Sequence, residues 1–160
     1  MTGGTLVLAG ANTYTGPTML DGTTLDLNGT SKTLARLEGT GRIRNGTLVV
    51  NDVLRPGGSG KVGTVRLDAA TTVTGIVEVE LGDRIYSAGT VDVTGATLLV
   101  TDLNSLQKWN SHLLIDTAEG VRGAFDETNL DGSGYQVLNT GKSLYLWNGS
   151  MSTGTTIFVR

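Results

Sequence analysis

Apolar and polar residues alternate along most of this chain with a period of two. Val65 and Leu67 flank Arg66, for example, so the two apolar side chains face the same way in an extended backbone. The same alternation recurs from Leu25 to Leu27, Val77 to Leu81, Val91 to Val93, Leu113 to Ile115, Leu144 to Leu146 and Ile157 to Val159. One apolar face and one polar face predict short strands that are buried on one side.

A Gly-Thr pair followed by alternating apolar residues recurs between residues 4 and 93. It begins at irregular intervals, at Gly4, Gly22, Gly46, Gly63 and Gly89. The intervals are 18, 24, 17 and 26 residues. Irregular intervals of about 20 residues are typical of a solenoid whose loops differ in length. The sequence therefore predicts an all-β fold, a parallel β-helix of roughly seven or eight coils at about 20 residues per coil.

A length of 160 residues suits a single domain, residues 1–160, with one continuous core. One segment breaks the alternation, because Leu103, Leu106 and Trp109 lie three apart, which is the spacing of a helical turn. The predicted organisation is repeat coils over 3–101, a helical turn or loop insertion over 102–111, terminal coils over 112–147, and a tail or cap strand over 148–160. A β-sandwich is the other all-β architecture, but the two-residue hairpin turns it needs are scarce.

Charge and composition exclude several classes of function. Only 17% of the residues are charged, the net charge is −3, and no block of Lys and Arg offers the phosphate neutralisation that nucleic-acid binding needs. No apolar run approaches the roughly 18 residues of a membrane-spanning helix, so we expect no membrane insertion by this segment. The chain has no cysteine, which excludes disulfides and cysteine-ligated metals.

The opening residues carry the most specific motif in the chain. Residues 3–18 read GGTLVLAGANTYTGPT, in which an Asn-Thr-Tyr-Thr-Gly turn follows a Leu-rich strand. This stretch resembles the autotransporter-associated β-strand repeat of bacterial passenger domains. Leu54-Arg55-Pro56-Gly57 and the run from Val121 to Phe125 are similar to the final coils of such passengers, so that the resemblance covers nearly all of residues 3–147.

The resemblance implies a single-stranded, right-handed parallel β-helix that is extracellular, on the bacterial cell surface and associated with the outer membrane. Its coils would continue the upstream β-helix coils of a longer passenger and help that passenger to fold as it emerges. The tail over 148–160 departs from the family pattern, which leaves the mode of anchoring open.

Two tryptophans, Trp109 and Trp147, are the candidate ligand-binding residues. Large aromatic rings stack on sugars and mark binding surfaces, so a host or microbial glycan is the candidate ligand. The alternative is that both rings pack a loop or cover one end of the β-helix.

Two acidic patterns suggest metal or acid–base chemistry. Glu78 and Glu80 lie on one strand face with Asp83 close behind, but an exposed acidic face that keeps a strand soluble is the favoured interpretation. Residues 127–132 match the opening of a calcium loop, but Leu138 occupies the position of its bidentate carboxylate. We therefore predict no metal site.

Two further patterns have ordinary structural interpretations. Residues 57–61 read GGSGK, but Val62 stands where a phosphate-binding loop needs Ser or Thr, so we expect a flexible turn. His112 is the only histidine, and a single histidine cannot form a multi-histidine metal site.

The leading functional hypothesis is a structural stalk or folding scaffold that acts as a monomer, without catalytic residues or a cofactor. The first alternative is an adhesin or glycan-binding module. The second is an enzyme that degrades polysaccharides, which would gather Asp, Lys and Arg on one face across adjacent coils. The sequence gives no sign of such a set, because Arg42, Arg44, Arg55, Arg66 and Asp68 are dispersed along it.

Overall fold

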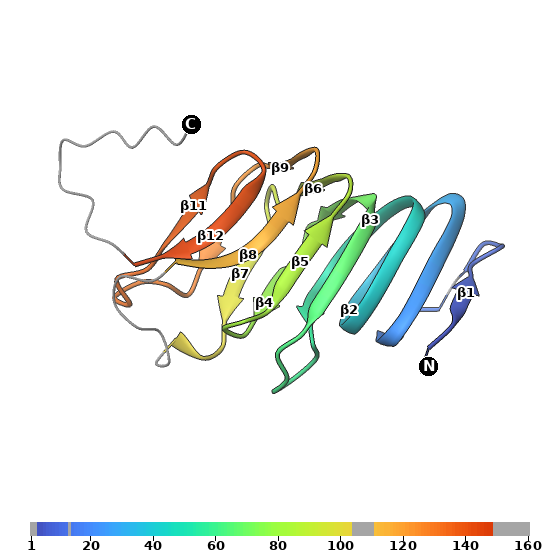
Figure 1. Ribbon diagram of the computed structural model, residues 1–160, viewed down its shortest axis with the longest axis horizontal. Coiled ribbons are helices and arrows are strands. Elements are labelled where there is room, and N and C mark those ends of the chain that lie inside the picture. The colour runs from blue at the N-terminus through green and yellow to red at the C-terminus, as the bar shows by residue number, and fades with distance from the viewer. Residues whose placement is uncertain (1–2, 13, 104–110, 149–160) are drawn as a thin grey trace.

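The protein is an elongated all-β solenoid. The computed structural model describes residues 3–12, 14–103 and 111–148, and 64% of these residues lie in strands. Figure 1 shows coils stacked along the long axis of the molecule, with β1 (Thr5–Val7) at one end and β11 (Gln136–Asn139) and β12 (Ser143–Trp147) at the other. The all-β prediction is therefore confirmed.

Between these ends the chain winds through nine further strands in the described residues. They are β2 (Thr18–Pro56), β3 (Thr64–Val73), β4 (Ile76–Val79), β5 (Arg84–Ser87), β6 (Thr90–Asp92), β7 (Thr97–Val100), β8 (Ser111–Thr117), β9 (Gly120–Arg122) and β10 (Glu127–Thr128). Strand β2 is one stretch of 39 residues that returns on itself, because its Gly39 and Gly41 lie against its own Leu20.

Three parallel ladders form the faces of the solenoid. The first ladder contains β1, two passes of β2, and then β3, β5 and β8. The second ladder runs through β2, β3, β6 and β9, and the third through β2, β4, β7 and β10. Successive coils thus add rungs to the same faces, which confirms the prediction of stacked parallel strands.

The solenoid has about four turns, so the predicted seven or eight coils are not confirmed. Gly41, Val65, Ile85 and Ile115 occupy equivalent register positions in the first ladder, so the coils between them differ in length, and the last of them is the longest. Two of these three coils are longer than the length assumed from the sequence, and residues 136–147 do not form a coil.

The interior is filled by the apolar residues of the alternating pattern. Val65 and Leu67 are at most 1% exposed, whereas Arg66 between them is exposed. The fully buried large side chains of all three ladders form one continuous core, which includes Leu27, Leu37, Ile43, Leu48, Leu54, Leu67, Ile85, Leu98, Ile115 and Leu144. Burial of these apolar surfaces is the main force that holds the coils together.

The pattern at β8 differs from the prediction that Leu113 and Ile115 face the interior together. The strand has an irregularity where Leu144 pairs with Ile115 and Tyr145 pairs with Leu113, so Leu114 is an extra residue. Leu114 and Ile115 are both buried, and Leu113 is only half-buried. A bulge of this kind shifts one side chain to the other face of a strand.

The direction of the chain reverses at the C-terminal end of the first ladder. Strand β12 pairs antiparallel with β8, and β11 pairs antiparallel with β12. The two strands form a hairpin across the end of the solenoid (Figure 1). The alternation of residues 112–147 did not predict this reversal.

Two sequence predictions fall largely outside the described residues. The helical turn over 102–111 falls mainly on residues 104–110, and Ser111 already belongs to β8. The tail over 148–160 is described only at Asn148. Within the described part of the chain, no helix is long and apolar enough to cross a membrane.

Candidate functional site

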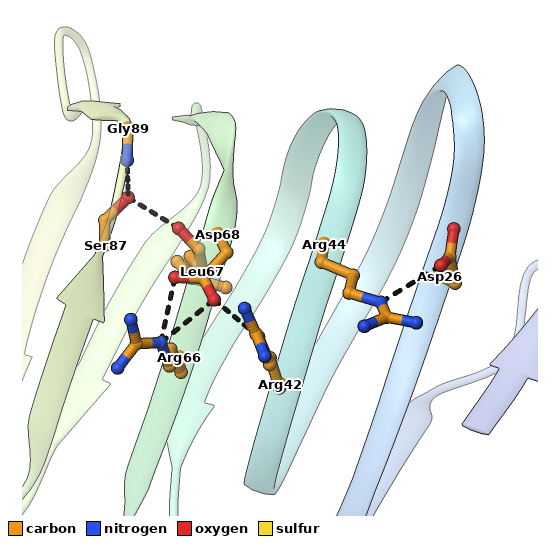
Figure 2. Close-up of polar contacts among 8 residues, drawn as sticks. All are labelled: Asp26, Arg42, Arg44, Arg66, Leu67, Asp68, Ser87 and Gly89. Atoms are coloured by element: carbon orange, nitrogen blue, oxygen red, sulfur yellow. Dashed lines mark hydrogen bonds and ion pairs between the residues drawn. The ribbon is translucent and has the colours of Figure 1, made fainter.

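The outer face of the first ladder gathers charged side chains from successive coils. Arg42 lies in register with Arg66, and Arg66 lies in register with Tyr86. Arg44, two residues after Arg42, is the register partner of Asp68. We call Arg42, Arg44 and Arg66 the arginine row (Figure 2).

Two aspartates hold the arginine row in place. The Nε atom of Arg44 donates to Oδ2 of Asp26 at 3.0 Å. The Nε atom of Arg66 donates to both carboxylate oxygens of Asp68 at 2.9 Å, and the Nε atom of Arg42 forms an ion pair with the same carboxylate. One carboxylate therefore joins arginines from two adjacent coils.

Both aspartates are stabilised in the charged form. The Asn28 N–H and the Asn45 side-chain amide donate to Asp26 at 2.9 Å and, together with Arg44, lower the pKa of its carboxyl. Burial alone would raise the pKa of Asp68, whose side chain is 7% exposed, but hydrogen bonds from Arg66 and Arg42 outweigh burial and lower it. The arginine row thus rests on carboxylates that stay ionised at neutral pH.

The structure brings together residues that are dispersed in the sequence. Arg42, Arg44, Arg66 and Asp68 lie on one face across adjacent coils, and only Arg55 lies elsewhere. The interpretation that this set is scattered is therefore wrong for four of its five members. Aligning positions 42 and 66 requires the length of the intervening coil, which the alternation of residues does not encode.

A guanidinium group remains protonated at all physiological pH values, so the arginine row is suited to bind an anion and not to transfer protons. A bound carboxylate or sulfate would accept two parallel hydrogen bonds from one guanidinium.

The third ladder carries a separate and more enclosed ion network. Arg55 follows Leu54, the register partner of Val77, and forms ion pairs with both Glu78 and Glu38. The Glu78 carboxylate raises the pKa of Arg55 further above its already high value. Because all three side chains are less than a fifth exposed, this network joins coils and offers little surface to a ligand.

Both carboxylates of the acidic pair noted at Glu78 and Glu80 bind groups of neighbouring segments. Glu78 pairs with Arg55, and Glu80 accepts a hydrogen bond from the Gly60 N–H at 2.7 Å. Asp83 accepts from the Gly63 N–H at 2.7 Å and the Glu80 N–H at 2.8 Å. Burial raises the pKa of Asp83, and these backbone hydrogen bonds only partly offset it. Glu80 and Asp83 therefore hold the loop between β2 and β3 against the next coil.

The segment that resembles a calcium loop also joins coils. The side chain of Asn129 accepts from the Val100 N–H at 2.9 Å and donates to the Val100 carbonyl at 2.8 Å. This side chain extends the third ladder as an additional strand would. Among the described residues, no group of three or more His, Asp or Glu side chains is arranged to hold a metal ion.

Of the two tryptophans predicted to bind a ligand, Trp109 lies outside the described residues. Trp147 lies at the end of β12, half-buried and in register with Gln136. Gln136 and Tyr135 line an open hollow of about 470 Å³ at this end of the molecule. The His112 ring lies 6.5 Å from the Tyr135 ring. The hollow and the arginine row lie on different parts of the chain.

Replacing both cations beside Asp68 should reduce stability more at neutral pH than in acid. The folded pKa of Asp68 lies below its ordinary value of 3.8, so its ion pairs contribute stability above that pH and lose it as the pH falls through the folded pKa. We expect Arg42→Gln/Arg66→Gln to lower the free energy of unfolding by about 1–2 kcal/mol at pH 7 and by less at pH 2. Urea unfolding at both pH values measures this difference, and an equal loss at both would contradict it.

Comparison with known proteins adds no relative to these observations. No protein family matches the chain, and no curated protein or solved structure is found to match it.

Proposed function

We propose that this chain is a structural segment of a bacterial cell-surface or secreted protein and forms the final coils of an autotransporter-like passenger. The opening motif in residues 3–18 supports the assignment to that class of protein. The observation that carries the structural role is the difference between the two ends of the first ladder.

The N-terminal end is an open parallel edge with apolar side chains. Strand β1 pairs with β2 on one side only in the described residues. Leu6 is 38% exposed and Val7 is 49% exposed. An edge strand with exposed apolar residues readily accepts a further strand, and a preceding coil of the same solenoid would cover these side chains.

The C-terminal end of the first ladder has a different character. There the antiparallel strands β12 and β11 follow β8, and the two ends of β11 are the exposed polar residues Gln136 and Asn139. Polar terminal units are how repeat proteins close a stack of coils. The chain is therefore suited to end a solenoid and to receive coils at its N-terminal side.

A coil added before β1 should stack on that strand. Thr5 pairs with Thr24, so residues 5–23 make up one coil, and a second copy of them placed directly before Thr5 supplies a matched rung. We expect slower hydrogen exchange of the β1 amides by at least about tenfold and a higher melting temperature, because repeat stabilities add through their interfaces.

The matched control is the same extension with serine at the copied positions of Leu8 and Leu20, which are buried in the present chain. This extension should leave exchange at β1 unchanged. Unchanged exchange with the unmodified copy as well would show that the N-terminal edge does not accept a coil, and the proposed role would fail.

A further inference from the structure

The arginine row is unusually accessible for residues that form ion pairs. The side chains of Arg42, Arg44 and Arg66 are 45%, 43% and 57% exposed. Arg42 and Arg66 are register partners on neighbouring rungs, and rungs of a sheet lie about 4.8 Å apart. The row therefore presents several cations at short intervals along the axis of the solenoid.

Each arginine of the row is held by its Nε atom, which leaves the outer part of the guanidinium available. In the described part of the chain, no hydrogen bond involves an Nη atom of Arg42, Arg44 or Arg66. In Figure 2 the two Nη atoms of Arg66 point away from Asp68. The aspartates hold the side chains through Nε, and each side chain remains at least 43% exposed.

The arginines of the third ladder are arranged differently. Arg55 directs Nη1 to Glu38 at 3.3 Å and Nη2 to Glu78. Arg36, with a side chain that is 42% exposed, directs an Nη atom to Asp52 at 3.6 Å. Exposure alone therefore does not distinguish the arginine row. Both Nη atoms of Arg55 face a carboxylate, whereas among the described residues no Nη atom of the row makes a hydrogen bond.

An exposed aromatic ring continues the row on the next coil. Tyr86 is the register partner of Arg66 and is 38% exposed. An exposed tyrosine ring offers a flat apolar surface on which a sugar ring can stack. Cations and an aromatic ring thus follow one another along the same face.

We propose that the arginine row and Tyr86 bind an acidic polysaccharide that lies along the axis of the solenoid, which adds a ligand-binding surface to the proposed structural role. Guanidinium forks bind carboxylates through two parallel hydrogen bonds, and a polyuronate carries one carboxylate on each sugar. Duplex DNA is a poorer match, since it carries one negative charge per about 1.7 Å, which is much closer than the roughly 4.8 Å between rungs of the row.

Isothermal titration of the full chain with polygalacturonate and with alginate tests this proposal. Arg42→Gln and Arg66→Gln should each weaken binding by about tenfold, the effect of losing a hydrogen-bonded charge. Tyr86→Ala should also weaken binding. Each single arginine variant leaves Asp68 with one cation, so the fold is retained, and circular dichroism melting curves verify this.

The matched control is Arg36→Gln, which removes the same charge from a side chain of similar exposure on another face. Its affinity should equal that of the wild type, and methyl-esterified polygalacturonate should not bind. The proposal is overturned if neither polyuronate binds, if Arg36→Gln is as damaging as Arg66→Gln, or if duplex DNA of equal charge binds as tightly. Because these readouts do not depend on added coils, they fail independently of the proposed structural role.

Discussion

Aspartate in place of Leu48 is expected to lower the free energy of unfolding by about 4 kcal/mol or more. Leu48 is fully buried in β2 and lies in register with Thr71 on the next coil. A carboxylate at this position would be surrounded by the apolar core and would find no cation to pair with. Because small domains have only about 5–15 kcal/mol of stability, the variant should be largely unfolded or melt at a much lower temperature.

Val49→Asp is the matched control, because Val49 is the next residue along the same strand and is half-exposed on the opposite face. The same charge there should change the free energy of unfolding by less than about 1 kcal/mol. Thermal unfolding followed by circular dichroism compares the two variants. Equal melting temperatures for Leu48→Asp and the wild type would show that the interior face of β2 is assigned incorrectly.

The features that the sequence predicted correctly are those that local alternation encodes. Val91 and Val93 are both fully buried, and Asp92 between them is half-buried, as a period of two requires. Recurrence of this pattern after Gly-Thr pairs also predicted that the strands stack in parallel. Neither inference depends on knowing which residue lies opposite which.

Register could not be predicted, and the candidate site depends on register. The coil that separates Arg42 from Arg66 is longer than the coil that separates Arg66 from Tyr86. Loops at the corners, such as the residues between Pro56 and Thr64, set these lengths without changing the pattern inside the strands. A prediction that assumes one fixed coil length would not bring Arg42, Arg66 and Tyr86 into register.

Strand direction is also absent from the alternating pattern. Leu144 and Leu146 are buried whether β12 runs parallel or antiparallel to β8, because the side-chain period is two in both cases. The proposal that coils add at the N-terminal end and that the C-terminal end closes the stack therefore rests on the structure and not on the alternating pattern.

Alanine in place of Gly39 is expected to destabilise the solenoid by about 3–5 kcal/mol. A Cβ atom at this position would lie 2.0 Å from the carbonyl oxygen of Leu20, which belongs to the preceding coil, and the residue has a φ of +98°. The Gly39 carbonyl also accepts a hydrogen bond from the Gly57 N–H at 2.9 Å. Any backbone shift that relieves the clash therefore disturbs contacts with the coils on both sides.

Gly29→Ala separates the steric clash from the cost of the backbone conformation. Gly29 also lies in β2 with a φ of +71°, but a Cβ atom there would meet nothing within 4 Å. We expect a loss of about 1–2 kcal/mol for this variant, which is the ordinary cost of a left-handed conformation for an L-residue. Urea unfolding of both variants gives the difference, which measures how closely neighbouring coils approach. Equal losses would mean that the coils at Gly39 are separated more widely than a 2.0 Å contact implies, and the close stacking of the first turns would have to be rejected.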